Sequence, residues 1–226
     1  MSGPTTCWAL LADAAGGDAR ETERFCALYR GLVVDFLSSR WRGSSALQDV
    51  EDAAQETLME CLRERGALQR AVDEAPRGFR AFLFGVTMNV ARRFEERRAR
   101  LRPELGVELP PSSLAPAEES TPEREFNRAW ARSVLSRARS AFERSAREAG
   151  GSRERRCEIL RLRFFENLPI RRIAEELGEE APRVHREYAR AREEFRGALE
   201  QVVRFESREG GDDLRSEMRE LMAHLA

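Results

Sequence analysis

Hydrophobic residues recur along most of this chain at the three- and four-residue intervals of an amphipathic helix. Between residues 20 and 41 the recurring apolar side chains are Phe25, Leu28, Tyr29, Leu32, Val33, Phe36 and Leu37. The same periodicity continues over residues 48–64, 79–101, 123–148 and 153–165. No segment shows the two-residue alternation that is typical of a half-buried strand. The pattern therefore predicts an all-α fold.

The segment Leu168–Arg196 has the pattern of two helices joined by a tight turn. Its first helix places Ile170, Ile173, Ala174 and Leu177 on one face, and its second helix does the same with Val184, Tyr188, Ala191 and Phe195. Gly178 stands where a helix end needs positive φ, and Pro182 stands in the next first turn. The second helix is rich in exposed cations, at Arg183, His185, Arg186, Arg190, Arg192 and Arg196. We predict a helix-turn-helix that reads the DNA major groove; the alternative is a helical hairpin with a solvated charged face.

Residues 103–122 interrupt the helical pattern and suggest a division into domains. They hold a dense run of prolines and glutamates without an aromatic residue, so they cannot bury enough apolar surface to fold alone. We therefore predict a first domain over 1–102, a linker over 103–122 and a second domain over 123–204.

Residues 205–226 form a C-terminal extension beyond the predicted second domain. Their last part places Leu214, Met218, Leu221, Met222 and Leu225 on one helical face. We interpret this as a short helix that packs back on the second domain. The alternative is a regulatory handle, because methionine-rich faces adapt to different partners.

The charges are balanced in total but uneven along the chain. All 39 basic residues are arginine, and 40 acidic residues bring the net charge to -1, whereas a free-standing DNA-binding protein usually carries a positive excess. Residues 79–102 nevertheless contain seven arginines and two glutamates. The predicted helix over 48–64 carries the polar residues Asp52, Gln55 and Glu56 opposite its apolar face. This distribution suggests a second partner besides nucleic acid.

Several classes of protein are disfavoured by what the chain lacks. The four cysteines, Cys7, Cys26, Cys61 and Cys157, are scattered without a CxxC pair, which argues against zinc and suits a reducing cytoplasm. We find no catalytic triad, phosphate loop or metal-ligand cluster, so we expect neither an enzyme nor a cofactor. No apolar run approaches the roughly 20 residues that span a bilayer, and no secretion signal is recognisable. We expect a cytoplasmic protein without membrane insertion.

Three stretches, in this order, resemble an extracytoplasmic-function sigma factor of the sigma-70 superfamily. VEDAAQETLMECL (50–62) is similar to region 2.2, with its Glu-Asp-x-x-Gln-Glu core beginning at Glu51. FRAFLFGVTMNVARRFEERRAR (79–100) is similar to regions 2.3 and 2.4, with Phe82, Leu83 and Asn89 at familiar positions. Residues 168–196 resemble region 4.2 and contain its Arg-Ala-Arg signature at Arg190–Arg192.

The resemblance implies a promoter-specificity subunit that binds bacterial core RNA polymerase at the β′ clamp and β flap. The β′ clamp helices would be faced by Asp52, Gln55 and Glu56. The loop 66–78 and the next helix would hold the melted minus-ten element, through Phe79, Arg80, Asn89, Arg92, Arg93, Arg97, Arg98 and Arg100. The minus-thirty-five element would be read by Arg183, His185, Arg186, Arg190 and Arg192. Aromatic surfaces for unstacked bases and cations for phosphates suit these roles. An anti-sigma factor is a further partner that the family allows.

Some positions depart from the family pattern, and two other functions stay open. Phe82 replaces a usual tryptophan, Glu180 a usual N-cap serine and His185 a usual lysine. Because residues 153–204 contain 13 arginines and 11 acids, we expect the second domain alone to bind DNA weakly and in a salt-sensitive way. The alternatives are a stand-alone helix-turn-helix regulator and an adaptor that binds polymerase without reading a promoter. The acidic face disfavours the regulator, and the arginine cluster disfavours the adaptor.

Overall fold

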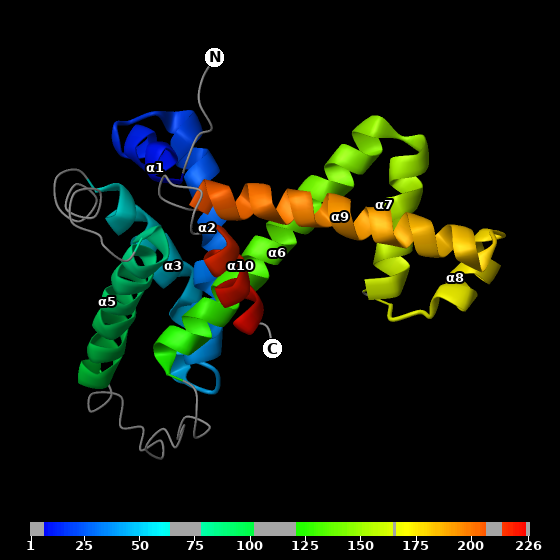
Figure 1. Cartoon of the computed structure of the whole chain (residues 1–226). Helices are drawn as coiled ribbons and strands as arrows, with labels where there is room; N and C mark the ends of the chain where they lie inside the picture. Colours follow the sequence, from blue (N-terminus) through cyan, green and yellow to red (C-terminus); the bar gives the residue numbers. More distant parts are fainter. Residues whose placement is uncertain (1–6, 64–77, 102–120, 165, 207–213, 225–226) are drawn as a thin grey trace. The chain divides into compact units, whose positions relative to one another are not determined.

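The computed structural model describes residues 7–63, 78–101, 121–164, 166–206 and 214–224 (Figure 1). Every regular element in these ranges is helical, so the predicted all-α fold is confirmed. The elements are α1 (Cys7–Ala15), α2 (Ala19–Arg40), the 3-10 helix η1 (Ser45–Asp49), α3 (Val50–Leu62), α5 (Gly78–Leu101), α6 (Pro122–Ala149), α7 (Gly151–Phe164), α8 (Ile170–Leu177), α9 (Ala181–Glu206) and α10 (Leu214–Ala223). Within the described ranges, no helix is both long enough and apolar enough to cross a membrane.

The chain divides into two compact units. The first unit is residues 1–133 with 204–226, and the second is residues 134–203. Helices α6 and α9 therefore each contribute residues to both units. The predicted linker, 103–122, lies outside the described residues except for Thr121 and Pro122, and the boundary between the units falls within α6.

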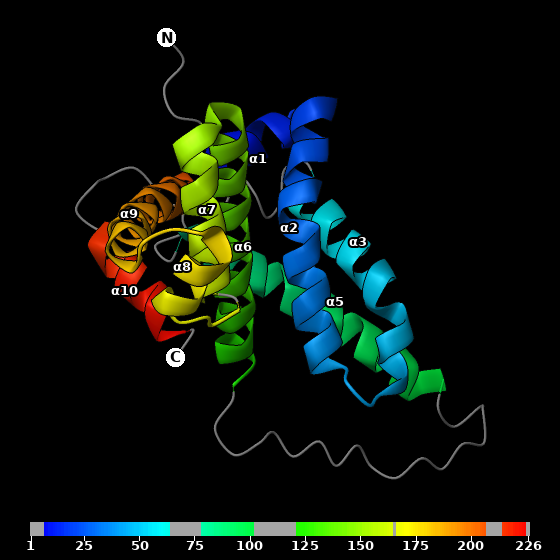
Figure 2. The ribbon, with the colours of Figure 1, turned by 90° about the vertical axis from the view of Figure 1, so that its right-hand side faces the viewer.

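In the first unit, α2 begins at a side-chain cap. The Asp18 side chain accepts from the backbone N–H groups of Arg20 and Glu21 and caps the start of α2. Helix α3 packs against both α2 and α5, and α1 packs against α2 (Figure 2). Helix α1 was not among the predicted elements, because its short, almost wholly apolar sequence shows no clear periodicity.

An aromatic core holds the first unit together. We give this name to the contacting rings of Trp8, Phe25, Tyr29, Phe36, Phe79, Phe82, Phe84, Phe126 and Trp130. Phe79 lies 4.9 Å from Tyr29 and 6.0 Å from Trp130 between ring centroids. Phe126 lies 5.3 Å from Phe36 and 5.2 Å from Phe84. The start of α6 thus completes the core of the unit that contains α2 and α5.

The second unit is a small helical domain centred on the predicted helix-turn-helix. Its core contains Ile159, Leu162, Ile173, Ala174 and Val184, from α7, α8 and α9. A second cluster joins Phe142 of α6 to Leu160 and Ala191, with Tyr188 and Phe195 packed against it. All four residues predicted to form the apolar face of the second helix, Val184, Tyr188, Ala191 and Phe195, are therefore buried or half-buried.

The C-terminal helix α10 belongs to the first unit. That unit also contains residues 123–133 of the predicted second domain, so the predicted packing of α10 on the second domain stays a prediction for those residues and does not extend to residues 134–203. Leu221 is 5% exposed, whereas the adjacent Met222 is 55% exposed, so the helix does bury one side. The periodicity of a short helix identifies its apolar face, but it contains no information about which surface receives that face.

Candidate functional site

The polar face of α3 is exposed as predicted from its sequence. Asp52 and Gln55 are exposed, and Glu56 is half-buried beside them. The opposite face is buried through Val50, Ala53, Ala54, Leu58 and Cys61. Met59 extends the exposed face by one turn and is 59% exposed, so this face combines carboxylate, amide and thioether groups. Sequence reasoning missed Met59, although it lies seven residues after Asp52 and therefore on the same face.

The exposed face of α5 is rich in arginine. Its members recur at helical spacing and are Asn89, Arg92, Arg93, Glu96, Arg97 and Arg100, all of them exposed. We call this set the α5 arginine stripe. Arg92 and Arg100 form no ion pair with any residue that the structure describes. The guanidinium of Arg97 lies 4.8 Å from the centroid of the Phe94 ring. These three arginines are available to phosphate groups.

Arg93 connects the α5 arginine stripe to the polar face of α3. Its guanidinium lies 3.1 Å from a carboxylate oxygen of Glu56 and 3.1 Å from one of Glu60. Two residues predicted for different partners, Glu56 and Arg93, therefore neutralise each other. The two surfaces meet along the contact between α3 and α5.

Arg98 lies off the stripe and serves the packing of η1 on α5. It donates to both carboxylate oxygens of Asp49, with Nη2 2.8 Å from Oδ1. These hydrogen bonds lower the pKa of Asp49; burial opposes this effect, and the charges of Arg98 and Arg97 add to it. Only 27% of the Arg98 side chain is exposed and its guanidinium is paired with Asp49, so a contact with DNA, which stays a prediction, would have to replace this pair.

Phe79 is also placed differently from the sequence prediction. Its side chain is 1% exposed and sits inside the aromatic core, 5.5 Å from the Trp8 ring. A ring enclosed in this way cannot stack on an unpaired base in this conformation, so the predicted role in base capture would require the aromatic core to open. Phe82 is half-buried and lies 6.2 Å from Trp8. Of the loop 66–78, which was expected to capture flipped bases, residues 66–77 lie outside the described residues and Gly78 begins α5.

The helix-turn-helix has the local geometry that its sequence predicts. Gly178 ends α8 with φ 63° in the left-handed region, and its N–H group bonds back to Ala174 and Glu175. Beyond the turn, the predicted reading residues of α9 are all exposed, namely Arg183, His185, Arg186, Arg190 and Arg192. Arg183 pairs with Glu179 at 2.9 Å and Arg190 pairs with Glu187 at 3.1 Å. His185 and Arg186 have no ion pair among the described residues.

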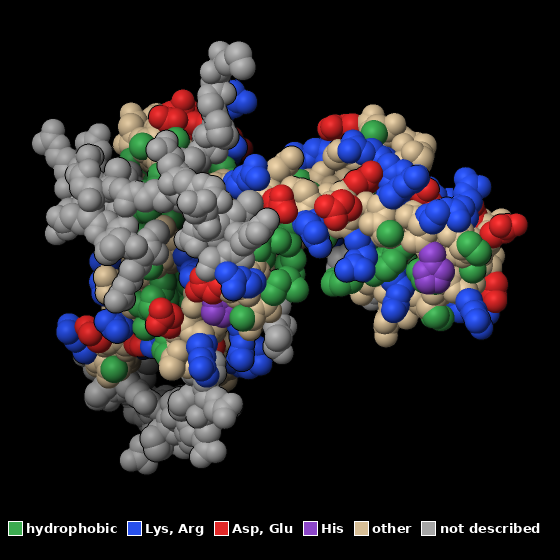
Figure 3. Space-filling model, viewed as in Figure 1, with side chains coloured by type: hydrophobic (Ala, Val, Ile, Leu, Met, Phe, Trp, Pro, Cys, Tyr) green, Lys and Arg blue, Asp and Glu red, His purple; other side chains and the backbone are tan. Residues whose placement is uncertain are grey.

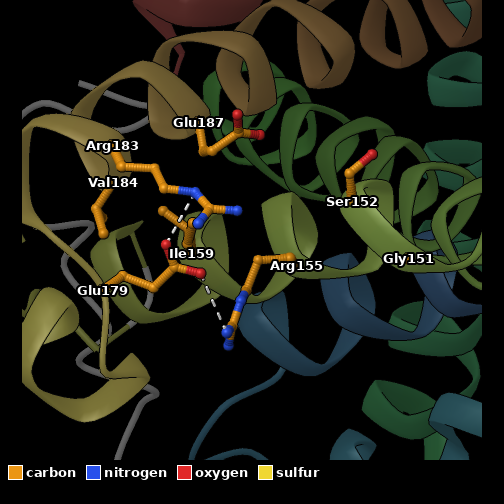
Figure 4. A pocket seen from close by; sticks show the side chains of 8 residues that line it. All are labelled: Gly151, Ser152, Arg155, Ile159, Glu179, Arg183, Val184 and Glu187. Carbon is orange, nitrogen blue, oxygen red and sulfur yellow. Dashed lines mark hydrogen bonds and ion pairs between the residues drawn. The ribbon is translucent and has the colours of Figure 1, made fainter.

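A pocket of about 330 Å³ opens beside this turn. Figure 4 shows Glu179 between Arg155 and Arg183, with oxygen–nitrogen distances of 3.4 Å and 2.9 Å. Glu187 supplies a second carboxylate to the lining. Because both arginines are already paired with a carboxylate, the pocket has no excess charge with which to hold a small anion.

Arg156 was missed by sequence reasoning, and it joins α7 to α9. Its guanidinium lies 3.3 Å from Glu187 and 2.8 Å from Glu194, and 11% of its side chain is exposed. The hydrogen bond that Arg156 donates to the Glu194 carboxylate raises the pKa of Arg156; burial opposes this effect and Glu187 reinforces it. Glu187 and Glu194 are two helical turns apart and so lie on one face of α9. This spacing was the sequence signal that a cation packs against that face.

The surface in Figure 3 carries interleaved basic and acidic side chains. Among the described residues, no group of three or more potential ligands could hold a metal ion. All four cysteines are free, and burial raises the pKa of the Cys61 thiol to about 12, so this thiol is protonated and unreactive.

Comparison with known proteins finds no match to this chain, either among protein-family models or among curated proteins.

Proposed function

We propose that this chain is a bacterial RNA polymerase sigma factor of the extracytoplasmic-function type. It has no catalytic activity of its own and acts in the cytoplasm. It binds core RNA polymerase, and the resulting complex recognises and melts promoter DNA. The observation that carries the proposal is the arrangement of α3 and α5, where an exposed polar face adjoins the α5 arginine stripe.

The polar face of α3 supports binding to core polymerase. Asp52 and Gln55 are exposed and form no ion pair or hydrogen bond with other described side chains, so their side chains are available to a basic partner surface such as the β′ clamp. The exposed Met59 adds an adaptable apolar contact at the same place. A regulator that only binds duplex DNA has no use for such a face.

Two separate cationic surfaces support binding to promoter DNA. Arg92, Arg97 and Arg100 suit the phosphates of a melted minus-ten element, because cations beside single strands hold the backbone. In the second unit, His185 and Arg186 project from a recognition helix and suit the minus-thirty-five element. The β flap is the expected polymerase contact of this second unit, and an anti-sigma factor would compete for the same surfaces.

Co-elution with bacterial core RNA polymerase in size-exclusion chromatography tests the proposal. Wild type is compared with Asp52→Ala/Gln55→Ala, which leaves Glu56 in place because that residue pairs with Arg93. The matched control is Glu23→Ala/Asp35→Ala, since both acids are exposed on α2 and have no ion pair among the described residues. We expect wild type and control to co-elute, and the α3 variant to bind at least about tenfold more weakly.

The opposite result favours the runner-up function. If no form binds core polymerase while the wild type retains duplex DNA, the chain is a stand-alone helix-turn-helix regulator. Equal co-elution of the α3 variant and wild type would remove the polar face of α3 from the polymerase contact.

A further inference from the structure

The C-terminal helix α10 contributes a carboxylate to one of the predicted DNA-binding cations. Arg80, in the first turn of α5, donates from Nη2 to Oε1 of Glu220 at 2.7 Å. The two residues are 140 positions apart in the sequence, so the contact is a tertiary one. It brings the last helix of the chain to the beginning of the helix that carries the α5 arginine stripe.

The end of α9, at Phe205 and Glu206, contacts α2 of the same unit. The Tyr29 hydroxyl donates to the Glu206 carboxylate at 3.1 Å, and the Arg24 guanidinium lies 5.8 Å from the centroid of the Phe205 ring. Seven residues, 207–213, then connect Glu206 to α10. Since a short connection keeps α10 at a high effective concentration near Arg80, Glu220 competes locally for that guanidinium.

We propose that α10 is an autoinhibitory helix, which keeps Arg80 paired with Glu220 until a nucleic acid strand takes the place of the carboxylate. The inference rests on the proposed function, because it assigns Arg80 to promoter DNA. A guanidinium presents the same fork of N–H groups to a carboxylate and to a phosphate, so it cannot hold both fully at once. Glu220 therefore occupies the position that a phosphate of the minus-ten strand would take.

The exposure of the pair suits a reversible contact. The side chains of Arg80 and Glu220 are 32% and 49% exposed, so water and phosphate can reach both. An exposed ion pair contributes little free energy and weakens with salt. A DNA strand brings many phosphates, and its binding releases counterions, so it can displace a single carboxylate.

The other paired arginines of α5 differ from Arg80 in where their acidic partners lie. Arg93 and Arg98 pair with acids of α3 and η1, which are packed directly against α5. Those acids can be moved away from α5 as part of their helices only if α3 and η1 leave their packing on α5. The acid that pairs with Arg80 comes from a separately connected helix, which can leave while α2, α3 and α5 stay packed.

Fluorescence anisotropy with full-length protein tests the inference, using a labelled single-stranded DNA oligonucleotide of mixed sequence as the probe. The forms compared are wild type, Glu220→Gln, Arg80→Gln, the double variant and the matched control Glu23→Gln, which removes one exposed charge elsewhere on the unit. We expect Glu220→Gln to tighten DNA binding by about fivefold, and Glu23→Gln to change it by less than about twofold. In the Arg80→Gln background, Glu220→Gln should have no more effect than the control.

Three results would overturn the inference. They are equal tightening by Glu220→Gln and Glu23→Gln, the same tightening with and without Arg80, and no binding of the probe by any form at low salt. Co-elution of the same forms with core polymerase distinguishes a failure of the autoinhibition proposal from a failure of the proposed sigma-factor function. Forms that co-elute but show no specific Glu220 effect sink the autoinhibitory role alone, whereas absence of co-elution by every form sinks the sigma-factor proposal.

Discussion

The arginines of α5 have different roles because they have different partners. Arg98 is held by Asp49, and Arg93 lies between Glu56 and Glu60. Arg92 and Arg100 extend into solvent without an ion pair among the described residues. A guanidinium that already satisfies a carboxylate contributes less to phosphate binding than one that does not. Fewer α5 arginines are therefore available to bind phosphate than the sequence of α5 contains.

Arg98→Gln should destabilise the protein by about 1–2 kcal/mol at neutral pH, because it removes hydrogen bonds to the Asp49 carboxylate. The pKa of Asp49 is lower in the folded protein than in the unfolded chain. The stability that Asp49 contributes is therefore fully present at a pH above its unfolded pKa, and it is lost as the pH falls through its folded pKa. The variant should therefore lose less stability than wild type below about pH 3.8. Urea unfolding as a function of pH measures both effects.

Arg100→Gln is the matched control for this measurement. It should leave stability nearly unchanged and alter DNA binding instead. Its exposed side chain has no ion pair in the described part of the chain, so stability should stay within about 0.5 kcal/mol of wild type. The logarithm of DNA affinity should instead fall less steeply with the logarithm of salt concentration, by about one unit of slope. Equal losses of stability in the two variants would contradict this division of roles.

At the scale of elements, the turn between α8 and α9 depends on backbone conformation. Gly178 has φ 63°, and a Cβ atom added there would meet no other atom within 4 Å. Gly197 lies within α9 and is equally open, but its φ is not in the left-handed region. The two positions differ in backbone conformation while offering the same free space.

Gly178→Ala and Gly197→Ala should therefore change stability in opposite directions. Gly178→Ala should cost about 1 kcal/mol, because a side chain is unfavourable at positive φ. Gly197→Ala should stabilise α9 by up to about 1 kcal/mol, the difference between glycine and alanine inside a helix. Chemical denaturation followed by circular dichroism measures both, and a stabilising Gly178→Ala would show that the turn is not under this constraint.

At the scale of the whole molecule, the first unit is assembled from segments that are distant in the sequence. Phe126 and Trp130 of α6 complete the aromatic core, and Glu206 of α9 accepts from Tyr29. The unit therefore needs residues that lie beyond the predicted linker. The predicted domain 1–102 lacks these contributions.

A fragment of residues 1–102 should consequently expose the aromatic core, bind a hydrophobic dye and unfold with poor cooperativity. A fragment of residues 1–133 restores Phe126 and Trp130 and should unfold more cooperatively, because burying two large aromatic side chains contributes several kcal/mol. Thermal unfolding and dye fluorescence of both fragments measure the difference. Identical behaviour of the two would show that α6 is dispensable to the unit.

The sequence by itself determined the features that depend on neighbouring residues. The helical period of α2, the polar face of α3 and the left-handed turn at Gly178 all arise within a few positions of the chain. Hydrophobic spacing and backbone conformation are local properties, so their pattern can be read without a structure. The exposure of the α9 residues that are predicted to read DNA follows from the same local rule.

Only the tertiary structure decided which of these side chains are available to a partner. Phe79 lies in the helix predicted over 79–101, but its enclosure by Trp8 and Trp130 requires α1 and α6. Arg98 and Arg80 have the same local sequence character as Arg100, yet they meet acids 49 and 140 positions away. The physical reason is that availability depends on contacts between helices, and periodicity within one helix carries no record of which helix lies against it.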